Sequence, residues 1–133
     1  MLFDVPLDET INICLDQLYC NVDKVHNLDR GQLKKLLYFA CKESHFLFNG
    51  QMYDQVNGIA MGCPLGPVLA DIFMSSVESV AFSNFTGALP NVYRRYVDDV
   101  FLAFNSRDDM SLFFNCLNSL NDCSYFTSYF VKI

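Results

Sequence analysis

The fold is decided by one stretch of the sequence, which reads Asn91-Val92-Tyr93-Arg94-Arg95-Tyr96-Val97-Asp98-Asp99-Val100-Phe101-Leu102-Ala103-Phe104. Two adjacent carboxylates stand in the middle of this apolar run. Neighbouring charges of one sign repel each other, and burying either one without a partner is costly. Because the residues on both sides favour strands, we predict a tight β-hairpin with the two acids at its bend.

The two acids have a functional and a structural interpretation. Adjacent side chains of an extended strand point to opposite sides, so one acid can face a cleft while the other lies nearer solvent. We assign Asp98 as the firmer metal ligand and Asp99 as the second. Aspartates that bind divalent metal are typical of phosphoryl-transfer sites, which normally need a further carboxylate from another strand. A solvated Asp-Asp turn is the alternative.

The chain before this stretch predicts two helices and a second hairpin. Pro6 can open a helix, and Asp29 with Gln32 resembles a capping box that starts another. Asn49-Gly50 between two apolar runs is a strong hairpin signal and predicts strands over 45–48 and 51–55. The predicted apolar faces of the two helices are Leu7, Ile11, Leu15 and Leu18, and Leu33, Leu36, Leu37, Ala40 and Cys41.

A glycine-rich loop follows, with Gly58, Gly62, Pro64 and Gly66. Such a segment is neither a regular helix nor a central strand, and its backbone can approach a ligand closely. It can line a nucleotide or a template base, or it can be a structural turn. A helix is predicted to begin at Pro67, with its packed residues at Leu69, Ile72, Phe73, Ser76, Val77 and Val80.

The end of the chain predicts one more helix and one more strand. Ser106 with Asp109 resembles a helix cap, and residues 125–131 favour a strand. The apolar residues of the helix are Leu112, Phe113, Cys116, Leu117 and Leu120. Hairpins mixed with helices indicate an α+β fold in which helices lie on one face of an antiparallel sheet.

Composition sets limits on the function. The chain has 133 residues, enough for one modest domain, and 52% of them are hydrophobic. Its net charge is -6, with nine Lys and Arg residues. This argues against a free-standing nucleic-acid binder, because phosphate contacts need basic side chains. Arg94 and Arg95 can meet template phosphate, but an ion pair at the strand edge is an equal alternative.

The six cysteines and the apolar runs bear on location. There is no Cys-x-x-Cys pair, so we expect reduced, buried thiols in an intracellular protein of the nucleus or cytoplasm, with disulfides as the alternative. The segment after Met1 lacks the features of a signal peptide. The most apolar run, 67–80, is interrupted by Asp71 and Glu78 and is too short to span a bilayer, so no membrane partner is expected.

Several segments, taken in order, resemble one family. They are Gln55-x-x-Gly58-x-Ala60-Met61-Gly62-x-Pro64-Leu65-Gly66-Pro67, then Leu69-Ala70-Asp71-x-Phe73-Met74, then Arg95-Tyr96-Val97-Asp98-Asp99. Together they resemble the palm domain of a reverse transcriptase. The glycine loop, the segment 5–11 and Phe48-Asn49-Gly50-x-x-Tyr53-x-Gln55 are most similar to Penelope-like retroelements. The resemblance covers nearly all of residues 1–133.

The resemblance implies an RNA-directed DNA polymerase of a transposable element, a nucleotidyltransferase that uses two Mg²⁺ ions. Asp98 and Asp99 match the metal-binding, catalytic acids of the family's Tyr-x-Asp-Asp motif, which begins here at Tyr96. The residues that the resemblance assigns to nucleotide or template binding are Gln55, Gly62, Pro64 and Tyr96. The partners would be an RNA or DNA template, a primer and dNTPs.

The sequence also departs from the family pattern. The family's other catalytic aspartate would fall before Met1, and Asp4 is too close to Pro6 to take its role. The basic fingers, the thumb and an endonuclease domain are not matched, and Cys63 stands where serine is usual. We therefore expect a palm fragment that is marginally stable, binds nucleic acid weakly or not at all, and does not polymerise by itself.

Two alternatives remain open. One is a non-enzymatic relic or a domesticated palm that acts as an interaction module, which an open frame or stop codons upstream of Met1 would distinguish from an enzyme. The other is a palm of a telomerase-like or intron-type transcriptase. The motif Ala60-Met61-Gly62-x-Pro64-Leu65-Gly66-Pro67 disfavours this second alternative.

Overall fold

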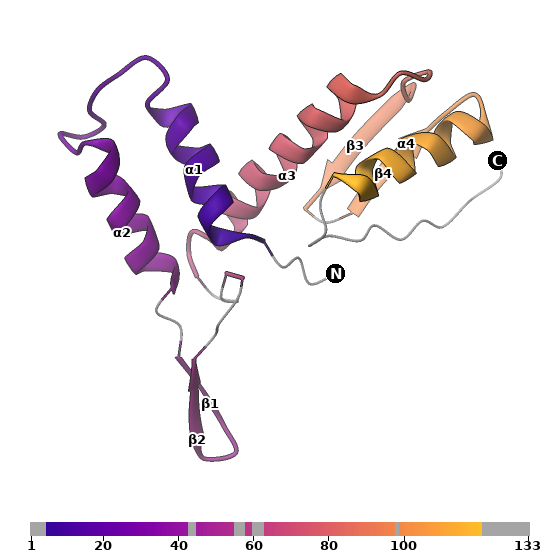
Figure 1. Cartoon of the computed structure of the whole chain (residues 1–133). Coiled ribbons are helices and arrows are strands. Elements are labelled where there is room, and N and C mark those ends of the chain that lie inside the picture. The colour runs from indigo at the N-terminus through magenta and orange to yellow at the C-terminus, as the bar shows by residue number, and fades with distance from the viewer. Residues whose placement is uncertain (1–4, 43–44, 55–57, 60–62, 98, 121–133) are drawn as a thin grey trace. The chain divides into compact units, whose positions relative to one another are not determined.

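The computed structural model describes residues 5–42, 45–54, 58–59, 63–97 and 99–120 (Figure 1). In chain order the elements are α1 (Leu7–Leu18), α2 (Arg30–Lys42), β1 (His45–Phe48), β2 (Gln51–Asp54), α3 (Gly66–Asn84), β3 (Val92–Tyr96), β4 (Asp99–Ala103) and α4 (Arg107–Ser119). This mixture of helices and antiparallel strands confirms the α+β prediction. The described strands form two separate two-stranded sheets instead of one. The chain divides into two compact units, residues 2–74 and residues 75–133.

The first unit begins with α1, which starts where the sequence predicts. Pro6 precedes the helix, and its carbonyl accepts hydrogen bonds from the backbone N–H and the hydroxyl of Thr10, at 3.0 and 2.8 Å. Ile11 and Leu15 are buried as predicted, whereas Leu18 at the end of the helix is exposed. The predicted apolar face therefore holds for the first three turns only.

Helix α2 opens with the predicted capping box. The backbone N–H of Gln32 donates to Asp29 Oδ1 at 2.8 Å, and the backbone N–H of Asp29 donates to Gln32 Oε1 at 2.9 Å. Each side chain thus satisfies a backbone N–H that the helix leaves without a partner. The predicted apolar face is wrong in part, because Leu36 and Ala40 are exposed.

The core of the first unit is a small cluster that joins α1, α2 and the beginning of α3. Its buried members are Cys14, Cys41 and Leu69, and the partly buried side chains around them are Leu7, Leu37, Ile59, Cys63, Leu65 and Ile72. Only the edge of α2 that carries Leu37 and Cys41 reaches this cluster. Leu36 and Ala40 lie off that edge, which explains their exposure.

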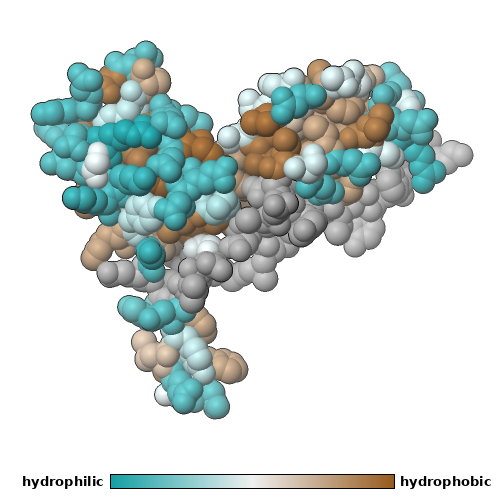
Figure 2. All heavy atoms as spheres, in the orientation of Figure 1, coloured by the Kyte–Doolittle hydropathy of each residue, from teal (hydrophilic) through white to brown (hydrophobic). Residues whose placement is uncertain are grey.

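Hairpin β1–β2 confirms the Asn-Gly prediction over 45–48 and 51–54, and residue 55 lies outside the described residues. Asn49 and Gly50 have φ of 49° and 77°, as a two-residue turn with both residues left-handed requires. All eight strand residues are exposed, contrary to the prediction of hairpins packed with helices. Figure 2 shows apolar atoms at the surface of this hairpin.

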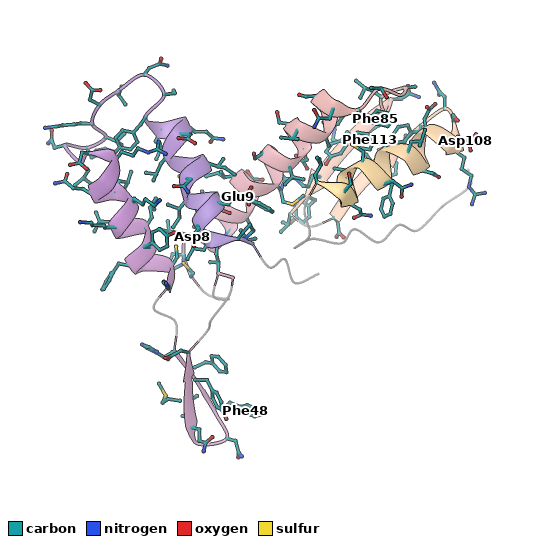
Figure 3. The ribbon with its side chains drawn as sticks, viewed as in Figure 1. Asp8, Glu9, Phe48, Phe85, Asp108 and Phe113 are labelled. Carbon is teal, nitrogen blue, oxygen red and sulfur yellow. The ribbon has the colours of Figure 1, made fainter. Side chains whose placement is uncertain are left out.

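The second unit packs β3–β4 against α3 and α4 around an aromatic core. The buried members are Ala81, Phe113 and Leu117, surrounded by Phe82, Phe85, Tyr93, Leu102, Phe104 and Leu120. The centroid of the Phe113 ring lies 5.0 Å from the ring centroid of Phe85, 5.3 Å from that of Phe82 and 5.7 Å from that of Phe104. Figure 3 labels Phe113 and Phe85. One ring thus contacts side chains from a helix, from the loop after it and from the segment after β4.

The predicted faces of α3 and α4 are partly wrong. Helix α3 begins at Gly66, one residue before the predicted start. Val80, which was predicted to be packed, is exposed, whereas Met74 and Ala81 are buried. Leu69 packs in the first cluster and Ala81 in the second, so a single stripe does not describe the helix. In α4, Leu112 is exposed. The strand predicted over 125–131 lies outside the described residues.

Candidate functional site

The predicted hairpin with two acids near its bend is present as β3–β4. Its ladder ends at the pair Tyr96 and Asp99, so residues 97 and 98 connect the strands. Asp99 is therefore the first residue of β4 and not part of the bend. Asp98, the acid that the sequence predicts as the firmer ligand, lies outside the described residues.

The pleat gives this hairpin one packed face and one open face. Tyr93 and Arg95 pair with Leu102 and Val100, and these four side chains are partly buried. Asp99 belongs to the other face, which is exposed. Its neighbours there are Arg94, Tyr96 and Phe101. The tyrosine is 80% exposed, so the acid and this ring are both accessible to a ligand.

The packed face holds an ion pair that links β3 to α3. Arg95 Nε donates to Glu78 Oε1 at 2.6 Å, and the side chains of these two residues are 12% and 15% exposed. The hydroxyl of Tyr93 donates to the same oxygen at 2.6 Å. Burial first, and then the hydrogen bond to Glu78, raises the pKa of Tyr93 above its usual value. The phenol therefore stays protonated and keeps donating.

Arg95 also reaches two other groups. Its Nη2 donates to Ser75 Oγ at 3.2 Å, and its Nη1 donates to the backbone carbonyl of Val97 at 3.3 Å. For Arg95 the sequence left template phosphate and an ion pair as equal alternatives, and the structure has the ion pair. Arg94 is exposed and its Nη1 donates to the carbonyl of Tyr93 at 3.0 Å.

The glycine loop is described from residue 63 and at 58–59. The N–H of Gly66 donates to the carbonyl of Cys63 at 2.9 Å, which closes a turn with Pro64 exposed at its tip. Gly58 has φ of 75°, a conformation that suits glycine. Gln55 and Gly62 lie outside the described residues. The predicted nucleotide-binding residues that can be placed are therefore Pro64 in the first unit and Tyr96 in the second.

The thiol of Cys63, the first residue of this turn, lies close to a second thiol on α2. Cys63 Sγ lies 3.9 Å from Cys41 Sγ, and Cys41 is buried. Burial, the hydrogen bond with Cys63 and the charge of that thiol together raise the pKa of Cys41 to about 11. Cys14 is buried too, as expected, whereas Cys20 is exposed.

The described acids do not by themselves form a metal centre. Within residues 5–42, 45–54, 58–59, 63–97 and 99–120, no group of three or more His, Cys, Asp or Glu side chains is placed to hold an ion. Asp99 nevertheless presents an accessible carboxylate, the ligand type that Mg²⁺ prefers. This side chain fits a magnesium ion as one ligand of a larger set.

Sequence reasoning missed Glu78 and Ser75 as partners of the hairpin. The sequence showed Glu78 only as an interruption of an apolar run. An acid on a helix that is otherwise apolar needs a cationic or hydrogen-bonding partner when it packs. That signal pointed to a partner for Glu78, but 17 residues separate it from Arg95, and sequence spacing alone does not connect them.

Comparison with protein-family models, with curated proteins and with solved structures finds no match for this chain. In the part of the chain that the structure describes, none of the helices has the length and apolar character that crossing a membrane requires.

Proposed function

We propose that the chain is a palm domain of an RNA-directed DNA polymerase of the Penelope-like type. One observation carries the proposal. Tyr96 and Asp99 are the last ladder pair of a tight hairpin and lie on its open face. An acid in this place can hold a metal ion beside a bound primer and nucleotide, as the Tyr-x-Asp-Asp resemblance implies.

The reaction would be nucleotidyl transfer. The 3′ hydroxyl of a primer would lose its proton to water as its oxygen forms a bond to the α-phosphorus of a dNTP. The bond from that phosphorus to the bridging oxygen would break, and pyrophosphate would leave. Bound Mg²⁺ supplies neutralisation of the charge that develops on the phosphoryl oxygens. Asp98 and Asp99 would be its ligands. The exposed ring of Tyr96 offers a surface on which a base or sugar can pack.

Two carboxylates are fewer than such a site normally uses. Phosphoryl transfer depends almost entirely on positioning and electrostatics, and a metal site with fewer ligands weakens both. We therefore expect that the purified 133-residue chain with Mg²⁺ incorporates no dNTP on a primed template. Template-directed incorporation would refute this expectation of inactivity, while strengthening the assignment of the polymerase family.

Metal binding tests the proposal without requiring turnover. Mn²⁺ can replace Mg²⁺ at oxygen ligands, and its unpaired electrons broaden the NMR signals of nearby amides. Titration of the full chain should broaden the amide signals of Tyr96 and Asp99 first. The variants Asp98→Asn and Asp99→Asn should each remove most of this broadening.

A matched control separates this site from general attraction to acids. Asp108 is an exposed acid in the first turn of α4, and Asp108→Asn removes the same charge elsewhere in the same unit. It should leave the broadening at Asp99 unchanged. If Mn²⁺ does not broaden the amide signals of the hairpin, or broadens them equally in Asp99→Asn, the proposed polymerase site is wrong.

A further inference from the structure

We infer that Arg95, held in place by Glu78, is a positioning residue that orients Asp99 for metal binding. This inference rests on the proposed function and assigns a role to residues outside its metal-binding set. Arg95 belongs to the packed face of the hairpin and Asp99 to the open face. It acts through the backbone of the turn that leads into Asp99.

The first support is the reach of one guanidinium group. Arg95 Nε bonds Glu78 at 2.6 Å, Nη2 bonds Ser75 at 3.2 Å and Nη1 bonds the Val97 carbonyl at 3.3 Å. The guanidinium is planar, with its donors in a fixed fork. Since two of these partners lie on α3 and the third lies in the turn, the position of the turn follows that of the helix.

The second support is the burial of the anchor. The Arg95 and Glu78 side chains are only 12% and 15% exposed, so water and salt screen their attraction less than on an open surface. Tyr93 donates to the same Glu78 oxygen at 2.6 Å, which fixes the carboxylate further. A pair of this kind adds little net stability but can specify geometry, and geometry is what a metal ligand needs.

The third support is the backbone of the turn itself. Val97 has φ of 56°, a left-handed conformation that costs a β-branched residue free energy. Such a conformation persists when its surroundings hold it. The hydrogen bond from Arg95 holds the Val97 carbonyl, and Asp99 begins β4 two residues later. Releasing that carbonyl would let the turn relax and Asp99 move with it.

Arg94 provides a matched control on the same strand. It is the same residue type, one position away, but its side chain is exposed and bonds the carbonyl of its neighbour Tyr93. Removal of either arginine removes one positive charge near Asp99. By Coulomb's law that change alone would strengthen binding of a cation. A positioning role predicts the opposite sign for Arg95.

The experiment compares Mn²⁺ titrations of the full chain in four variants, Arg95→Gln, Arg95→Lys, Glu78→Gln and Arg94→Gln. The readout is the Mn²⁺ concentration that half-broadens the Asp99 amide signal. We expect this concentration to rise about tenfold in Arg95→Gln and in Glu78→Gln, as for other residues that orient metal ligands. Arg95→Lys should not restore the wild-type concentration, because one ammonium group cannot reach all three partners. Arg94→Gln should lower the concentration slightly.

The outcomes separate the inference from the proposed function. If Arg95→Gln behaves like Arg94→Gln, or if it loses the whole β3–β4 ladder, Arg95 has no positioning role. If it does not fold at all, Arg95→Lys gives the deciding result, because it keeps the positive charge, so that a higher Mn²⁺ concentration cannot come from a change of charge. If Mn²⁺ does not act at wild-type Asp99, the proposed function fails. Metal-free hydrogen exchange at Val97 and Asp99 then shows whether Arg95 holds the turn.

Discussion

Val97 and Cys41 show how single residues can be set by their surroundings and not by their own preferences. Valine favours extended backbone, yet Val97 has φ of 56° at the turn before Asp99. Cysteine has an ordinary pKa of 9.0, yet burial and its neighbour Cys63 raise the pKa of Cys41 to about 11. In both cases the surroundings of the residue set its state: the backbone conformation of Val97 and the pKa of Cys41.

The raised pKa of Cys41 predicts a loss of stability at alkaline pH. From about pH 9 to about pH 11 the unfolded chain loses the thiol proton while the folded chain keeps it. Ionisation therefore favours the unfolded state, and the free energy of unfolding falls as pH rises through this window. Well below pH 9 the thiol is neutral in both states and contributes no slope.

Urea unfolding at pH 8 and pH 10.5 checks this prediction. Between these two pH values the free energy of unfolding should fall by about 2 kcal/mol more in the wild type than in Cys41→Val. The valine keeps an apolar side chain but cannot ionise. Equal losses in the two proteins would show that Cys41 does not titrate differently on folding.

At the scale of elements, local hydrogen bonds set where helices and turns begin. The reciprocal bonds of Asp29 and Gln32 start α2, and Asn49-Gly50 closes the first hairpin. At α4, Ser106 Oγ accepts from the N–H groups of Asp108 and Asp109, at 3.2 and 3.5 Å. These signals involve residues at most a few positions apart, which is why the sequence reveals them.

Loss of the α4 cap should destabilise the second unit. Ser106→Ala leaves the N–H groups of Asp108 and Asp109 without their acceptor, at a cost of about 1 kcal/mol. Ser111→Ala is the matched control, because its hydroxyl only donates to the carbonyl of Arg107 on an exposed turn of the same helix. Thermal unfolding should show a lower midpoint for Ser106→Ala alone. Equal midpoints would mean that the cap contributes nothing.

At the scale of the whole molecule, each of the two units has its own small core. A two-stranded hairpin is marginal in water unless it packs against something else. In the second unit α3 and α4 provide that surface for β3–β4, and Phe113 is its centre. The hairpin that carries Asp99 therefore depends on aromatic packing on the face opposite the acid.

Truncation of Phe113 should disrupt this support. Phe113→Ala removes a fully buried ring that contacts Phe82, Phe85 and Phe104, and the expected cost is about 3–5 kcal/mol. Phe101→Ala, on the open face, should cost far less, because Phe101 is exposed. Urea unfolding followed by circular dichroism measures both. If the two variants are equally stable, the aromatic cluster is not the core of the unit.

The local features of this protein can be predicted from its sequence. The capping box, the Asn-Gly turn, the Ser106 cap and the hairpin of residues 92–103 all follow from short-range hydrogen bonds and backbone preferences. Those forces act between residues that are close in the chain, so a pattern of a few residues is enough to predict them.

The buried faces of the helices and the pairing of charges become clear from the tertiary structure alone. Leu36 and Leu112 fit their helical stripes but are exposed, while Ala81 is buried. Glu78 meets Arg95 across 17 residues, because packing brings α3 beside β3. Burial and ion pairing depend on which elements meet in space, and the spacing of residues within one element does not carry that information.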